Sequence, residues 1–424
     1  MKIPKGAAIA VSLAFGPKTS VPVGRLAIKP NGGVLLEYAP EFIASGLRIN
    51  PRLGIPNNEL VHPREPRIFH GLHGIFADSL PDAWGEVLLR RLAATNGIDF
   101  NTLTGLDRLA IVGHRAVGAL TYDPQTDVVP VGAIDLDALA NESHEILAGN
   151  DSAMLAQLEQ LGGSPGGARP KVLVAMDADG HLIAGSDSIP DTYEGWMVKF
   201  RGPADAEDVG PLEAAYADMA RAARVNVTAS RLIHTDRGPG YFSTQRFDRG
   251  HDGTRVHAAT LAGLLDVNWA IPNMDYNGVM GAVRFFTRNE AAVVEMFRRM
   301  VFNVIAGNRD DHTKQHSFLM DASGQWTLAP AYDLTFSSGP GGHHYLMVAG
   351  EGRDIGPEHV RKVAETQNID SRVVASIIEE VRTAVDRFAE FAATYGVSTP
   401  TLRSVSPALT ASVRAFGRGG PSVV

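Results

Sequence analysis

The chain has 424 residues, 44% of them hydrophobic and 20% charged, which is enough for two or three domains with sizeable cores. A net charge of −8 and a pI near 6.0 argue against broad non-specific nucleic-acid binding. The sequence has no cysteine, which excludes disulfides, thiolate catalysis and cysteine-ligated metal centres. The cytoplasm is therefore the expected compartment.

Residues 1–125 are expected to form an α+β domain. Strand-like apolar runs come first, and a helix is expected to begin after Pro81. A polar connector from Asp123 to about Asn141 follows and marks a boundary. No stretch is long and apolar enough to cross a membrane, so no membrane contact is expected.

The second domain is expected over residues 145–250 and contains a glycine-rich turn at 162–171. Gly166 and Gly167 would let backbone amides approach phosphate oxygens closely, and Lys171 would add positive charge. The pattern is neither a Walker A loop nor a GxGxxG motif. An ordinary surface loop is therefore the alternative interpretation.

Lys199 lies in an apolar strand, where its ammonium group must reach solvent or an anion. Fourteen residues later Glu213 begins a helix expected over 211–223. Kinases pair a strand lysine with a glutamate of the next helix to fix the lysine against nucleotide phosphates. An exposed lysine and an acid that serves only the helix dipole are the alternatives.

A second strand pair, expected within 228–249, ends at the sequence Gln245-Arg246-Phe247-Asp248-Arg249. Backbone groups of Gln245 and Phe247 could pair with an adenine edge at this point. A strand end closed by an Arg–Asp ion pair is the alternative.

The third domain, residues 251–424, is expected to be mainly helical, with long helices over 287–306 and 370–395. Gly307 ends the first of these helices immediately before the polar loop 308–316.

This loop and the residues that follow it carry the strongest functional signal. An apolar run at 317–320, a turn at 321–324 and a strand at 325–328 form a hairpin, which returns the chain so that Asp310 and Asp333 are expected to lie near each other. In kinase-like enzymes one such acid accepts the proton of the attacking hydroxyl and the other binds magnesium. A metal-dependent hydrolase that uses Asp310, Asp311 and His312 is the rival chemistry.

Taken together, the chain resembles the HipA family, the serine/threonine-kinase toxins of bacterial type II toxin–antitoxin systems. The resemblance covers nearly the whole chain. Its motifs are Phe76 to Asp82, Arg246-Phe247-Asp248-Arg249, Asn308 to Lys314 and Tyr332-Asp333, of which the last two are the specific ones.

The resemblance implies an α+β, protein-kinase-like two-lobed fold that uses ATP and magnesium. It has an N-terminal α+β subdomain and a mainly helical C-terminal lobe. Asp310 would be the catalytic base, with Asp333 and Gln315 as magnesium ligands. The nucleotide would be bound by Ser164, Gly166, Gly167, Lys171, Lys199, Gln245, Phe247, His312 and Tyr332, with Glu213 supporting Lys199.

The resemblance further implies autophosphorylation at Ser164, which disorders the loop and inactivates the kinase. Gln315 departs from the family, which usually has asparagine there, so a catalytically weakened kinase that acts as a nucleotide-binding corepressor is a second interpretation. The implied target is a translation component, most typically glutamyl-tRNA synthetase among the aminoacyl-tRNA synthetases. The implied partner is a HipB-like helix-turn-helix antitoxin, through which operator DNA would mainly be contacted.

Overall fold

The computed structural model of this protein describes residues 3, 6–29, 32–125, 134–162, 166–185, 189–250, 253–272 and 274–417. The chain forms two compact units. The first combines Met1–Asp205, Ser243–Val267 and Phe318–Trp326, and the second combines Ala206–Phe242, Asn268–Ser317 and Thr327–Val424. Each unit is assembled from several stretches of chain, and the division predicted at 1–125, 145–250 and 251–424 stays a prediction.

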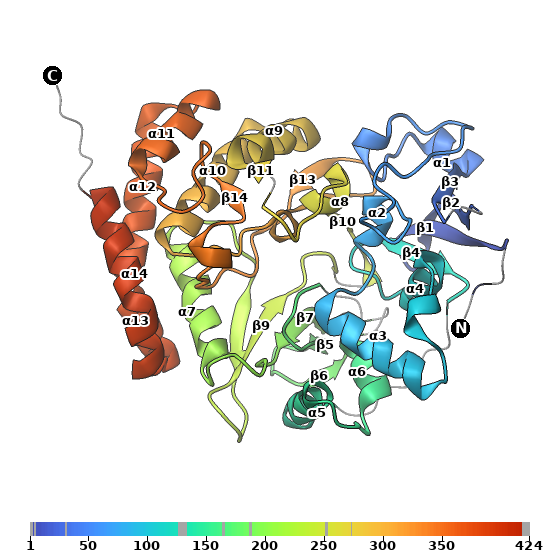
Figure 1. The fold of residues 1–424 in the computed structure, drawn as a ribbon, viewed down its shortest axis with the longest axis horizontal. Helices are drawn as coiled ribbons and strands as arrows, with labels where there is room; N and C mark the ends of the chain where they lie inside the picture. Colours follow the sequence, from blue (N-terminus) through green and yellow to red (C-terminus); the bar gives the residue numbers. More distant parts are fainter. Residues whose placement is uncertain are drawn as a thin grey trace. The chain divides into compact units, whose positions relative to one another are not determined.

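The first unit begins with an antiparallel sheet in the order β3-β2-β1-β4 (Figure 1). Every second residue of β1 is buried, including Ile9, Val11 and Leu13, because successive side chains of a strand point to opposite faces. The strands of this sheet are β1 Ala8–Gly16, β2 Thr19–Ile28, β3 Val34–Tyr38 and β4 Leu120–Asp123.

The helices of the first unit lie between β3 and β4 or after β4 in the sequence, and α3 packs against α6, which in turn packs against β5 (Lys171–Met176). The helices are α1 Pro40–Ser45, α2 Gly74–Ala77, α3 Ala83–Thr95, α4 Gly105–Val112, α5 Leu136–Ala148, α6 Leu155–Gly162 and α8 Leu261–Leu265, with short 3₁₀ turns η1 Pro51–Leu53 and η2 Phe100–Thr102. The connector predicted from Asp123 to Asn141 is too long, because α5 begins inside it with Asp135 accepting a hydrogen bond from Ala138 N.

Two further sheets complete the first unit. One contains β6, β5, β7 and β9 in that order, and all six residues of β5 are buried. The other has the order β10-β12-β13 and contains the predicted hairpin. The strands are β5 Lys171–Met176, β6 Leu182–Ala184, β7 Glu194–Lys199, β9 Tyr241–Gln245, β10 His257–Thr260, β12 Ser317–Met320 and β13 Trp326–Leu328.

The second unit is mainly helical, as predicted for this part of the chain. Helix α7 packs against α12 and α13, and α10 packs against α9, α12 and α14 (Figure 1). Its elements are α7 Val209–Ala222, β8 Ser230–Ile233, β11 Met274–Asp275, α9 Tyr276–Thr287, α10 Glu290–Ile305, η4 Thr313–Gln315, η5 Pro340–Gly342, β14 Leu346–Met347, α11 Pro357–Thr366, α12 Ser371–Asp386, α13 Phe388–Tyr395 and α14 Thr399–Gly417.

Two helix predictions need correction. The helix predicted over 370–395 is two helices, α12 and α13, which meet at Arg387. The helix predicted to begin near Glu213 begins at Val209, so Glu213 is buried inside α7 and does not open it. No helix in the described part of the chain is long and apolar enough to span a membrane.

Candidate active site

The loop that follows α10 presents Asp310 to solvent. The side chain of Asp310 is 46% exposed, and its Oδ1 lies 3.8 Å from Nε2 of His312, which is 12% exposed. An exposed carboxylate can accept a proton from a substrate without having to be uncovered first. Asp310 therefore meets the accessibility requirement of the predicted general base.

The hairpin brings the two sides of the predicted site together. Ala329 N donates a 3.0 Å hydrogen bond to Ser317 O, and the Tyr332 hydroxyl donates a 2.6 Å hydrogen bond to Lys314 O. Beyond Tyr332, Asp333 Oδ2 accepts a 2.8 Å hydrogen bond from the side-chain amide of Gln315. The loop and Asp333 thus lie side by side, whereas the predicted closeness of Asp310 and Asp333 themselves stays a prediction.

Asp333 occupies an unusual backbone conformation. Its φ is +55°, in the left-handed region that residues other than glycine seldom adopt. Such conformations cluster at functional sites because the surrounding structure must hold them. The contact with Gln315 is one of the interactions that hold this residue.

Aromatic rings surround His312. Its ring centroid lies 5.0 Å from that of Trp269 and 5.4 Å from that of Tyr345, and Lys314 Nζ lies 5.1 Å from the Trp269 ring. The packing restricts the orientation of His312 beside Asp310. Sequence reasoning missed Trp269 and Tyr345, because nothing in their local sequence indicates that they meet His312.

Two predicted phosphate-binding lysines lie opposite each other in the first unit. Lys171 on β5 pairs in register with Lys199 on β7, and their exposed fractions are 4% and 9%. Two buried ammonium groups on neighbouring strands carry a high desolvation cost unless negative groups accompany them. This arrangement makes the alternative of an exposed strand lysine wrong for Lys199.

The described end of the glycine-rich turn is bound to the start of α3. Gly167 N donates to the Asp82 carboxylate, Trp84 N donates a 3.2 Å hydrogen bond to Gly167 O, and Lys171 Nζ donates to Gly166 O. Asp82 is the N-cap residue of α3, but its side chain makes no capping hydrogen bond to that helix. Ser164, the predicted phosphorylation site, lies outside the described residues.

The other predicted nucleotide contacts are half-buried or buried. Gln245, at the end of β9, pairs with Trp196 and is half-buried, as is Phe247. Glu213 is 3% exposed, and its pairing with Lys199 stays a prediction.

Charged side chains form an ion cluster just after Gln245. An Arg–Asp ion pair at this strand end was the alternative interpretation of the sequence. Asp248 Oδ2 lies 2.8 Å from Arg246 and 2.7 Å from Arg249, and it accepts a 2.7 Å hydrogen bond from Gly118 N. Burial alone would raise the pKa of Asp248, but the two guanidinium charges and these hydrogen bonds outweigh it and hold the pKa well below the usual range. This cluster is structural.

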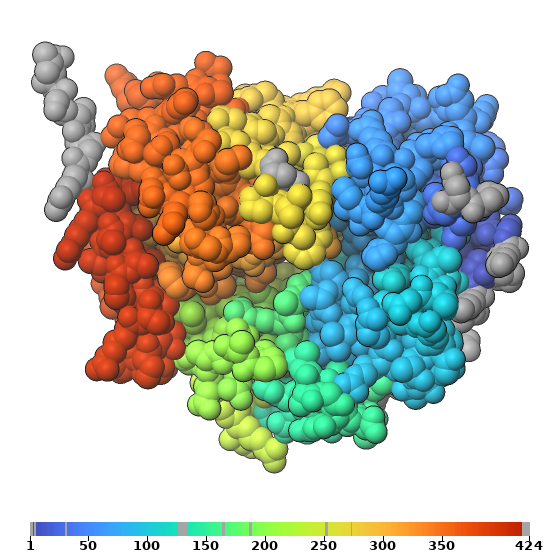
Figure 2. Space-filling model, in the orientation of Figure 1, coloured from blue at the N-terminus to red at the C-terminus, as the bar shows by residue number. Residues whose placement is uncertain are grey.

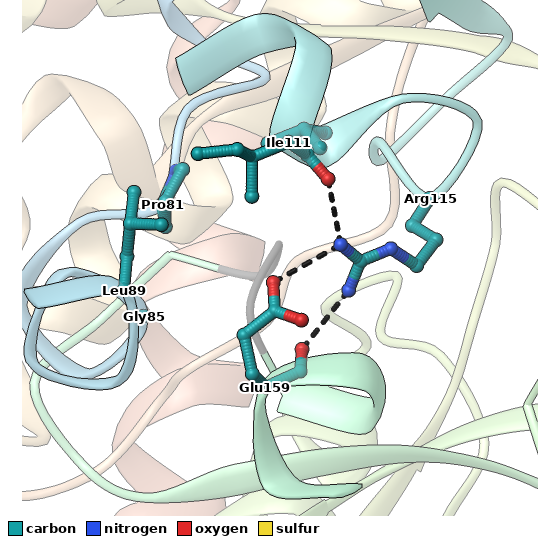
Figure 3. A pocket seen from close by; sticks show the side chains of 7 residues that line it. Pro81, Gly85, Leu89, Ile111, Arg115 and Glu159 are labelled. Carbon is teal, nitrogen blue, oxygen red and sulfur yellow. Dashed lines mark hydrogen bonds and ion pairs between the residues drawn. The ribbon is translucent and has the colours of Figure 1, made fainter. Parts of the chain in front are cut away.

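Two hollows of the described structure lie away from the predicted site residues. One cavity, of about 10 Å³, lies beside the Arg115–Glu159 ion pair of the first unit and is large enough for one water molecule at most (Figure 3). A shallow groove of about 630 Å³ is lined by residues of α14, the helix drawn in red in Figure 2. Neither is lined by any of the predicted site residues.

Comparison with family models identifies the class of protein. The HipA-like C-terminal domain matches residues 163–388, and the HipA N-terminal domain matches residues 18–123. The first match alone covers more than half of the chain. The chain therefore belongs to the HipA family, as the sequence resemblance indicated.

Solved structures agree with this assignment at the level of the fold. A chain from the Shewanella oneidensis MR-1 toxin–antitoxin complex of HipA, HipB and operator DNA is similar, with 16% identity, a TM-score of 0.69 and coverage of 97% of both chains. The Helicobacter pylori proinflammatory kinase CtkA gives 13% identity and a TM-score of 0.33 over 54% of this chain and 94% of its own. Comparison with curated proteins gives no match. The predicted α+β, HipA-like fold class is confirmed by the first likeness.

Proposed function

We propose that this protein is an ATP- and magnesium-dependent serine/threonine protein kinase and the toxin of a HipA/HipB-like module. The observation that carries the proposal is the 2.8 Å hydrogen bond between Gln315 and Asp333. It places the loop of the exposed Asp310 beside a second acid within one unit of a HipA-family chain. Kinase-like phosphoryl transfer uses one acid to accept the proton of the attacking hydroxyl and a second acid to bind the metal ion.

Five of the predicted residues would have distinct roles in this chemistry. Asp310 would accept the proton as a substrate hydroxyl oxygen bonds to the γ-phosphorus and the bond to the β-phosphate oxygen breaks. Asp333 and Gln315 supply carboxylate and amide oxygens, the ligand types that suit Mg²⁺. Lys199 and Lys171 would neutralise phosphate charge, which fits their burial.

The biological role rests on the family and on a similar complex. The Shewanella oneidensis structure contains HipA, HipB and operator DNA, and we propose a HipB-like antitoxin for this chain, which would make most of the DNA contacts. The net charge of −8 agrees with DNA binding through a partner. We propose a translation component such as an aminoacyl-tRNA synthetase as the target and Ser164 as an autophosphorylation site.

One observation favours a second candidate, a weakened kinase that acts as a nucleotide-binding corepressor. Gln315 directs its NH₂ group toward Asp333, so its oxygen must turn before both residues can hold one magnesium ion.

The hydrolase interpretation is weaker, because the carboxylate of Asp311 is fully buried and engaged by four hydrogen-bond donors. Among the described residues, a group of side chains that could bind a metal ion lies elsewhere in the sequence. It consists of Asp177, Asp179 and His181.

Incubation with ATP and magnesium, followed by intact-mass and peptide mass spectrometry, tests the proposal. The expected result is one added phosphate on Ser164 in the wild-type protein and none in the variant Asp310→Ala, with nucleotide binding retained in both. The starting protein must first be shown to be unmodified at Ser164. No transfer to Ser164 or to an aminoacyl-tRNA synthetase, with nucleotide still bound, would favour the corepressor.

A further inference from the structure

The two consecutive acids of the loop have opposite environments. Asp310 is 46% exposed, whereas Asp311 is completely buried. Burying a carboxylate costs several kcal/mol unless hydrogen bonds replace its hydration. The position of Asp311 therefore requires donors that the fold supplies.

Four donors surround the Asp311 carboxylate. Its Oδ2 accepts hydrogen bonds from the Tyr276 hydroxyl over 2.9 Å and from His344 Nδ1 over 3.0 Å. Its Oδ1 accepts from the backbone nitrogens of Tyr345 over 2.9 Å and Leu346 over 3.2 Å. The carboxylate is thus an internal anchor of the second unit.

The anchor connects the loop to two helices. Tyr276 is the first residue of α9, and its hydroxyl also accepts a 2.9 Å hydrogen bond from Asn303 of α10. Asn303 in turn accepts a 3.0 Å hydrogen bond from the side chain of Asn308, at the start of the loop. Burial first, and then the charge of Asp311, raises the pKa of Tyr276 well above its ordinary value, so its hydroxyl stays protonated and donates.

Both chain neighbours of Asp310 are bound to one segment. Arg309 donates a 2.7 Å hydrogen bond to Gly342 O, and Asp311 binds the backbone of Tyr345 and Leu346. Leu346 belongs to β14, which pairs with β11 immediately before α9. The backbone of Asp310 is therefore held on both sides, although its own side chain is exposed.

From this geometry we infer that Asp311 is a positioning residue, which fixes the backbone of Asp310 so that the neighbouring carboxylate meets the substrate hydroxyl. This inference rests on the proposed kinase function. Small displacements of a catalytic group are costly, because a shift of about 1 Å can reduce a rate about a hundredfold. Nucleotide affinity depends on other residues and should respond much less.

Tyr276→Phe and Asp311→Asn are the test variants, and Tyr395→Phe is the matched control. Tyr395 also donates to a carboxylate, that of the partly exposed Asp218, over 2.6 Å, in the same unit but outside the loop. Tyr276→Phe removes one donor and keeps the ring, so it keeps the inference testable if Asp311→Asn fails to fold. The measurements are kcat and KM for ATP, and hydrogen exchange of the peptide 308–316 without nucleotide.

We expect kcat of Tyr276→Phe to fall about tenfold or more, KM for ATP to change less than about twofold, and amides of 308–316 to exchange faster. Tyr395→Phe should leave all three unchanged. Unchanged kcat or exchange in a folded Tyr276→Phe protein, or an equal kcat loss in Tyr395→Phe, would overturn the inference. An inactive wild-type protein would instead refute the kinase proposal, and the exchange data would still show whether the anchor holds the loop.

Discussion

The side-chain amide of Gln315 donates a hydrogen bond of 2.8 Å to the carboxylate of Asp333. The amide NH₂ therefore faces Asp333, whereas Gln315 would hold the proposed magnesium ion through its amide oxygen. A rotation of the amide by about 180° would turn the oxygen toward Asp333, which breaks this hydrogen bond and is favourable only when a cation lies between the two oxygens. The longer glutamine stem then decides how well the oxygen reaches the metal.

Shortening this side chain should help magnesium binding. We expect Gln315→Asn to reach half-maximal phosphoryl transfer at a lower magnesium concentration, because the family usually has asparagine here and Mg²⁺ demands nearly ideal octahedral geometry. A magnesium titration of transfer measures this, with the exposed Gln325→Asn as control. An unchanged or higher magnesium requirement would mean that the loop already accommodates glutamine.

The glycine-rich turn offers a test of its packing against Lys171. Gly167 has a φ of +109°, and a Cβ there would overlap Lys171 Nζ, whereas Gly180 has a φ of +89° and open space. Both alanine variants incur backbone strain of about 1 kcal/mol or more. We expect Gly167→Ala to lower the free energy of unfolding by about 1 kcal/mol more than Gly180→Ala, measured by urea denaturation. Equal losses would show that the Lys171 side chain moves aside without cost.

The Asp248 cluster should be a major source of stability. Asp248→Asn removes the charge that neutralises buried Arg246 and Arg249, which is expected to cost about 3–5 kcal/mol near neutral pH. The folded pKa of Asp248 is depressed, so its contribution is complete above the unfolded pKa of about 3.9 and is lost as pH falls below that value. Urea denaturation near neutral pH and in acid should show that the free energies of unfolding of the wild-type protein and Asp248→Asn converge in acid. A gap that persists there would contradict the assignment.

Buried histidines should make the protein sensitive to mild acid. Burial lowers the pKa of His257 from 6.5 to about 4, although its hydrogen bond to Ile49 O partly opposes this shift. Below about pH 6.5 His257 is protonated in the unfolded chain but stays neutral in the folded chain. The free energy of unfolding therefore falls as the pH decreases toward 4, by about 3 kcal/mol for this group. His257→Gln keeps a donor for Ile49 and should lose correspondingly less stability between about pH 7 and 4.5. An identical pH slope in denaturant unfolding would exclude His257 as a cause.

Elements with strong local signals could be predicted from the sequence. The hairpin β12–β13 formed as expected, because Asp321 Oδ1 accepts hydrogen bonds from the backbone of Ser323 and Gln325 within the turn itself. The break at Arg387 was missed, since the apolar period continues from α12 into α13. Phe388, after the break, packs on Tyr216 of α7, a contact that no local pattern reveals.

The candidate site was only partly predictable, because some of its contacts join segments that are far apart in the sequence. Gln315 and Asp333 meet because a short hairpin joins their segments, which the sequence shows directly. The contact between Asp82 and Gly167 joins residues 85 positions apart, and an acid at a helix start normally caps its own helix. Sequence reasoning had no signal for it.

Local sequence suffices to predict the family, the order of the elements and the spacing of Asp310, Gln315 and Asp333, because turns and hairpins depend on neighbouring residues. Which of the two adjacent acids is exposed depends on the tertiary fold. Asp310 and Asp311 are chemically identical and occupy the same loop, and their difference comes from Tyr276 and His344, donors brought from distant parts of the chain. Burial of a charge is decided by such long-range partners, since a carboxylate stays buried only where the fold supplies enough donors.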